Sequence, residues 1–181
     1  MKYAIVTLMA TFVAASAIAQ GTVNFANNTS TPLIDGRTGQ PTQTTDEFTI
    51  GLWWGPVGGE LTQAVNADTD QVATAENRGA PPPVLAGQFN GGKPLKIKGA
   101  AESAQIAFEV RVWDTATGEA MFGSGAGTVM TGGGTAPAGN LFGAGEGQIG
   151  SITIEVVPEP TSFALAGLGA AALMIFRRRS P

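Results

Sequence analysis

The residues best suited to bind a ligand lie on one predicted strand, residues 105–114 (QIAFEVRVWD). Side chains alternate along a strand, so Glu109, Arg111 and Trp113 share its polar face. By the same parity Trp53 projects from the polar face of a second strand and Trp54 toward the core, and Asp114 ends the first. Exposed indoles can stack on a sugar ring while charged neighbours hydrogen-bond its hydroxyls. Packing of the tryptophans against the sheet is the favoured interpretation, and a glycan contact is the alternative.

A second group, Asn66, Asp68 and Asp70, offers oxygen ligands at alternate positions, as the start of a calcium loop does. Such a loop would need glycine at its sixth position and glutamate at its twelfth, where Gln71 and Asn77 stand. A solvated acidic loop is therefore favoured over a calcium site. The sequence predicts no other metal site and no cofactor.

Two short motifs match known signatures with little specificity. Residues 145–150 (GEGQIG) have dinucleotide-fingerprint spacing, but a predicted strand follows them where that fingerprint needs a helix, so we predict a turn. Asn27 and Asn28 each begin an N-x-[S/T] sequon for sugar attachment.

The composition excludes several classes of activity. The chain has no cysteine and no histidine, which removes thiolate nucleophiles, disulfides, Cys/His zinc sites and imidazole bases. Four of the 10 basic and one of the 14 acidic residues lie in the terminal segments, which leaves residues 20–157 with a net charge of about −7. This acidic segment argues against nucleic-acid binding. Its scattered carboxylates single out no acid–base pair, so we predict no catalytic residues, with a glycan hydrolase as the remote alternative.

The elements that would position these residues are short strands. Most of the chain's 26 glycines and 11 prolines lie in residues 20–157, which favours strands joined by turns. Alternating patterns predict the strands listed here: 22–25, 47–54, 61–65, 84–85, 95–98, 105–114, 128–130 and 151–157. The prediction is an all-β domain over residues 20–157, most economically a single antiparallel β-sandwich, jelly-roll-like or Ig-like.

Three stretches of this domain have weaker patterns. Residues 66–77 are a weak candidate for a short helix. Pro81, Pro82 and Pro83 predict a polyproline II connector. Residues 123–150 contain so many glycines that we predict a long loop or a loosely paired hairpin there.

The N-terminal segment has the features of a signal peptide. Residues 1–19 carry one cation, an apolar run and the small-residue site Ala17-Ile18-Ala19. Cleavage by signal peptidase is expected before Gln20, and an uncleaved anchor is the alternative.

The C-terminal segment, residues 158–181, has three parts. Pro158, Glu159 and Pro160 precede the uncharged residues 161–176, and Arg177, Arg178 and Arg179 follow. Sixteen helical residues reach about 24 Å, enough for a marginal transmembrane helix. The arginines stay cytoplasmic by the positive-inside rule, so residues 20–157 are expected outside.

This order of tripeptide, apolar segment and terminal arginines resembles the PEP-CTERM sorting signal of Gram-negative bacteria. The resemblance implies cleavage near Pro158–Pro160 by an exosortase, a transient stay in the inner membrane, and release or attachment at the cell surface. An anchor that is never cut is the alternative. The domain itself loosely resembles small exported PEP-CTERM proteins at residues 21–25 (GTVNF) and 110–114 (VRVWD).

The expected protein is therefore a non-enzymatic envelope or matrix protein with a structural or adhesive role. The resemblance implies an association with exopolysaccharide or biofilm. A carbohydrate-binding module using Trp53 and Trp113 is the alternative.

Overall fold

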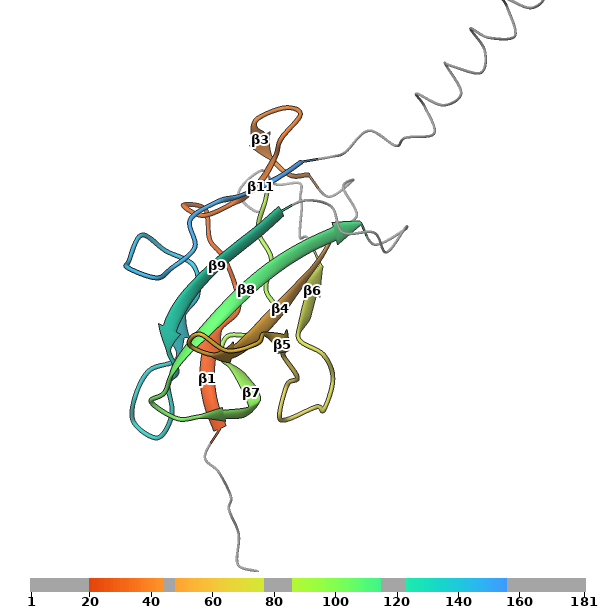
Figure 1. The fold of residues 1–181 in the computed structure, drawn as a ribbon. Coiled ribbons are helices and arrows are strands. Elements are labelled where there is room, and N and C mark those ends of the chain that lie inside the picture. Colours follow the sequence, from red (N-terminus) through yellow and green to blue (C-terminus); the bar gives the residue numbers. More distant parts are fainter. Residues whose placement is uncertain (1–19, 44–47, 77–85, 115–122, 156–181) are drawn as a thin grey trace, which may run out of the picture.

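The structure, a computed structural model, describes residues 20–43, 48–76, 86–114 and 123–155, and every regular element there is a strand (Figure 1). The prediction of an all-β fold is confirmed for this part of the chain. In chain order the strands are β1 (Gln20–Asn24), β2 (Leu33–Asp35), β3 (Gln40–Pro41), β4 (Phe48–Pro56), β5 (Thr62–Gln63), β6 (Thr74–Glu76), β7 (Leu95–Ala101), β8 (Gln105–Asp114), β9 (Gly123–Met130), β10 (Gly139–Asn140) and β11 (Ile152–Ile154).

The largest sheet is built around the long pair β4 and β8. Its order is β5-β4-β8-β9, with β6 also paired to β4, and β4 and β8 run antiparallel over nine opposed residue pairs. Two smaller sheets have the orders β10-β1-β7 and β11-β2-β3. Figure 1 shows β9, β8 and β4 side by side, with β1 and β7 toward one end and β3 and β11 toward the other. The strands thus form three hydrogen-bonded sheets, and the two-sheet sandwich stays a prediction.

The expectation of purely antiparallel pairing is wrong for two pairs of strands, and an isolated bridge between Phe142 and Ile149 is also parallel. β10 pairs with β1 in parallel, and β11 pairs with β2 in parallel. In both cases a strand from the C-terminal third returns beside one of the first two strands through a long connection. Alternation of side chains reports which face a residue occupies and not the direction of its neighbour, so the sequence pattern could not distinguish the two cases.

The core lies against the inner face of the large sheet. Ile50 and Leu52 of β4 and Phe108 and Val110 of β8 are almost completely buried. At the other side of the core Phe89 makes edge-to-face contacts with Phe25 and Phe142, each with ring centroids 5.3 Å apart. These contacts join the segments of the chain that follow β1 and β10.

Glycines on β9 allow residues 147–152 to pack closely against this strand. A Cβ at Gly123 would lie 3.0 Å from Cγ2 of Ile152, and one at Gly125 would lie 2.6 Å from Cγ2 of Ile149. At Gly127 it would meet the carbonyl oxygen of Gly147 at 2.0 Å. The strand predicted at residues 128–130 is therefore the end of a longer strand, and the loop predicted over residues 123–150 is wrong for residues 123–127, whose alternate glycines face inward.

The weakly predicted helix at residues 66–77 is also wrong. Asn66 instead bridges to Ile97, its side-chain Oδ1 accepts the Asp68 amide N–H, and Asp70 has a φ of 58°. The segment then returns to β4 as β6. Asparagine and aspartate satisfy the backbone locally in this way, which favours a turn over a helix.

Some predictions fall outside the described residues: the signal peptide at 1–19, the polyproline connector at 81–83, the strand at 84–85 and the tail at 158–181. No helix long and apolar enough to cross a membrane occurs within residues 20–155 as described.

Candidate functional site

The predicted glycan residues meet on the outer face of the β4–β8 pair. In the register of this pair Trp53 lies opposite Glu109, Gly51 opposite Arg111, and Thr49 opposite Trp113. Directly opposed residues of an antiparallel pair share a face, so the six residues of these three pairs form one surface. We call it the tryptophan face.

The two tryptophans contact each other above Gly51. Their ring centroids are 5.8 Å apart with an angle of 77° between the planes, an edge-to-face pair. A Cβ on Gly51 would lie 2.6 Å from Cη2 of Trp113 and 2.8 Å from Cζ3 of Trp53. The missing side chain at residue 51 therefore provides the seat on which both rings rest, and each ring is half-buried.

Arg111 joins the aromatic pair to the charged part of the face. Its guanidinium carbon lies 4.5 Å from the centroid of the Trp53 ring, and Nη2 donates a hydrogen bond of 2.6 Å to Oε2 of Glu109. The guanidinium is thus held by a carboxylate and by the π-system of Trp53. The result is an ordered surface of two indoles and one neutralised ion pair.

The sequence predicted which of these residues share a face but not the contacts between them. Trp53, Trp113, Glu109 and Arg111 are brought together, and Asp114 ends β8 opposite Phe48, with its side chain outside the described part. Trp54 faces the core, against which it packs as predicted. The role of Gly51 could have been found by aligning the two predicted strands as neighbours. The sequence alone did not say that they pair.

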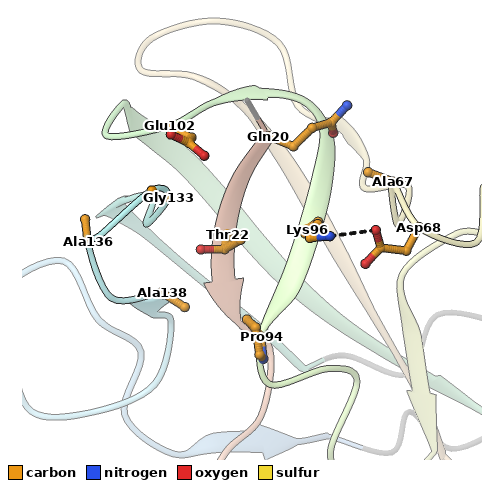
Figure 2. A pocket seen from close by; sticks show the side chains of 11 residues that line it. Gln20, Thr22, Ala67, Asp68, Pro94, Lys96, Glu102, Gly133, Ala136 and Ala138 are labelled. Carbon is orange, nitrogen blue, oxygen red and sulfur yellow. Dashed lines mark hydrogen bonds and ion pairs between the residues drawn. The ribbon is translucent and has the colours of Figure 1, made fainter. Parts of the chain in front are cut away.

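A groove of about 490 Å³ lies beside β1 and β7 and is lined by residues of both strands. Figure 2 shows the ion pair of Lys96 and Asp68 to one side of Thr22, and Glu102 and Gly133 to the other. The carboxylate of Glu102 packs over Gly133, where any side chain would collide with it. The lining of the groove combines small residues with charged groups, and two of these charged groups, Asp68 and Lys96, already pair with each other.

Lysine side chains pair with both carboxylates of the candidate calcium loop, Asp68 and Asp70. Asp68 accepts a hydrogen bond of 2.8 Å from Nζ of Lys96, and Asp70 accepts one of 2.5 Å from Nζ of Lys98. Asn66 uses its oxygen for the Asp68 amide. Within the described ranges no group of three or more acidic, histidine or cysteine side chains could hold a metal ion. The arrangement therefore favours an ion-paired surface loop.

Asn27, the first residue of a sequon, makes hydrogen bonds within the fold. Its Nδ2 donates to the carbonyl oxygens of Thr31 at 2.9 Å and Gly87 at 2.8 Å, and its Oδ1 accepts the Phe89 N–H at 2.8 Å. Asn28 is exposed, and its Oδ1 accepts the amide of Ser30. Of the two sequons, only Asn28 offers an exposed side chain.

The chain leaves the folded domain beside the β2–β3 turn. The Gly36 N–H donates to the carbonyl oxygen of Ile154, the last residue of β11. Asp35, buried in the same turn, is hydrogen-bonded by the side chain and then by the backbone N–H of Arg37, and these bonds lower the pKa of Asp35. An ionised carboxylate thus fixes the turn at this exit.

The predicted processing residues lie at and beyond the ends of the described part. Gln20 is the first residue of β1, directly after the expected signal cleavage site, whereas Ala17 and Ala19 lie outside the described residues. Pro158, Glu159, Pro160 and the three terminal arginines also lie outside them.

Comparison with protein families assigns the C-terminal segment. A PEP-CTERM protein-sorting motif matches residues 156–179, which include the tripeptide, the apolar segment and the arginines. The chain is therefore an exported protein whose C-terminus is a membrane-anchoring and sorting segment addressed to an exosortase. No curated protein and no solved structure matches the chain. The role of the domain at residues 20–155 must therefore be inferred from its own fold and surface.

Proposed function

We propose that this protein is a non-enzymatic structural or adhesive component of the cell envelope or extracellular matrix, linked to exopolysaccharide or biofilm. Signal peptidase and an exosortase process it, and the inner membrane holds it only transiently. The sorting motif carries the proposal, because it begins at residue 156, two residues after β11 ends at Ile154. The sorted cargo is consequently the β-rich domain, whose sheets we propose to pack as a sandwich.

Electrostatics and packing support a structural role. The domain is acidic, and its described residues form ion pairs at Asp35, Asp68, Asp70 and Glu109. It depends on close glycine packing and an aromatic core instead of disulfides. Such a domain can persist outside the cell without cysteine chemistry.

The test is where the protein accumulates and what its loss does. Cells are fractionated into periplasm, outer surface and extracellular matrix, and the protein is followed with an antibody. We expect the processed form at the surface or in the matrix, and a weaker matrix in a deletion strain. Exclusive recovery from the periplasm with an unchanged matrix would contradict the proposal.

A second candidate function is glycan binding by the tryptophan face. It is favoured by the edge-to-face pair of Trp53 and Trp113 and by Arg111, whose position is fixed by Glu109. Preorganised aromatic and polar groups lower the ordering cost of binding a sugar. Glu109 would accept hydrogen bonds from hydroxyl groups beside the stacked ring.

A further inference from the structure

We infer that the tryptophan face takes a neutral polysaccharide chain, one hexopyranose ring at a time, and excludes acidic polysaccharides. The inference rests on the second candidate function above. It assigns a ligand class to that face, argued from the charges and ring geometry around it.

Few cations lie on the described part of the tryptophan face. Arg111 is the cation of the tryptophan face, and the carboxylate of Glu109 already neutralises it at 2.6 Å. Lys96 and Lys98 belong to β7 in another sheet and pair with Asp68 and Asp70. A uronate carboxylate would have to displace Glu109 from Arg111 and approach a domain of net charge about −7. The electrostatic balance therefore opposes acidic chains.

The positions around the indoles suit hydroxyl groups. On β9 the residues opposite Arg111 and Glu109 are Ser124 and Ala126, both exposed. On the other flank Thr74 of β6 lies opposite Gly51. These neutral neighbours add no charge, and Ser124 and Thr74 can donate and accept hydrogen bonds.

The ring geometry sets how many sugars can stack. The planes of Trp53 and Trp113 differ by 77°, and the guanidinium of Arg111 lies over Trp53. A pyranose ring that stacks on one indole therefore meets the other indole at a steep angle, as a side wall. One stacked ring per domain gives weak binding. The affinity depends on contacts with the uncharged surface of the polysaccharide and changes little with salt concentration.

The experiment is native gel electrophoresis of the exported protein through gels that contain a dissolved polymer. Gels with a neutral β-glucan, a neutral galactomannan or polygalacturonate are compared with a plain gel. The variants are Trp113→Ala, Trp113→Phe and Arg111→Lys, with Val57→Ala as the control because Val57 is exposed in the turn that follows β4. Thermal unfolding of each variant shows whether it remains folded.

We expect retardation by at least one neutral polymer, unchanged up to about 0.5 M salt, and none by polygalacturonate. Trp113→Ala should weaken it about fivefold to tenfold, whereas Trp113→Phe and Val57→Ala should retain most of it. Stronger retardation by polygalacturonate would overturn the ligand class while leaving the tryptophan face in place. Retardation that folded Trp113→Ala retains in full, or none by any polymer, would overturn both this inference and the glycan-binding function.

Discussion

Asn27→Ala should destabilise the domain far more than a single polar surface substitution does. The side chain makes three hydrogen bonds of 2.8–2.9 Å, to Thr31, Gly87 and Phe89, which join two segments some sixty residues apart. At a net contribution of about 0.5–1.5 kcal/mol per bond, their loss costs roughly 2–4 kcal/mol. The upper part of this range applies because the Phe89 amide belongs to a residue that is 2% exposed and would lose its acceptor.

The assay is thermal unfolding followed by circular dichroism, with Asn28→Ala as the matched control. For a domain of this size about 1 kcal/mol corresponds to roughly 3–4 °C, so Asn27→Ala should lower Tm by about 7–14 °C. Asn28 is exposed and caps only a local turn, so its variant should change Tm by a few degrees at most. Equal shifts for the two variants would refute the reasoning, as would a sugar found attached to Asn27 in the folded protein.

Three further predictions concern packing and charge. Gly125→Val should cost about 1–3 kcal/mol in urea unfolding, because its side chain would collide with Ile149, and a neutral effect would contradict the packing of β9. Gly51→Ala should displace both rings of the tryptophan face and alter the near-UV circular dichroism. An unchanged spectrum would contradict the packing of both rings on Gly51. The lowered pKa of Asp35 means that its ionised form adds stability above the ordinary pKa of 3.8, and this stability is lost as the pH falls below it. The unfolding midpoint of Asp35→Asn should therefore change less than that of the wild type below about pH 4, and parallel curves would contradict this role.

Strands whose side chains alternate strictly were predictable. Residues 105–114 form β8 with the predicted bounds, because the buried positions from Ile106 to Val112 need the core while Glu109 and Arg111 need water. The same parity placed Trp54 toward the core and Trp53 on the outer face.

What escaped prediction depends on neighbours that are distant in sequence. β9 contains glycines because Ile149, Ile152 and Gly147 press against it, and composition alone makes such a segment look like a loop. The two parallel pairs depend on where β10 and β11 return. The Trp53–Trp113 contact exists only because β4 and β8 pair in one register over Gly51. Neither the pairing nor its register is present in either strand's own pattern.

The most direct test of the central claim, that the C-terminus is a sorting segment which delivers the folded domain, is the intact mass of the exported protein. We expect a chain that begins at Gln20 and ends near Pro158–Pro160. The Pro158→Ala, Glu159→Ala double variant should instead accumulate at the membrane with its arginine-rich end still attached. A surface form that keeps residues 161–181, or normal processing of the double variant, would contradict the account.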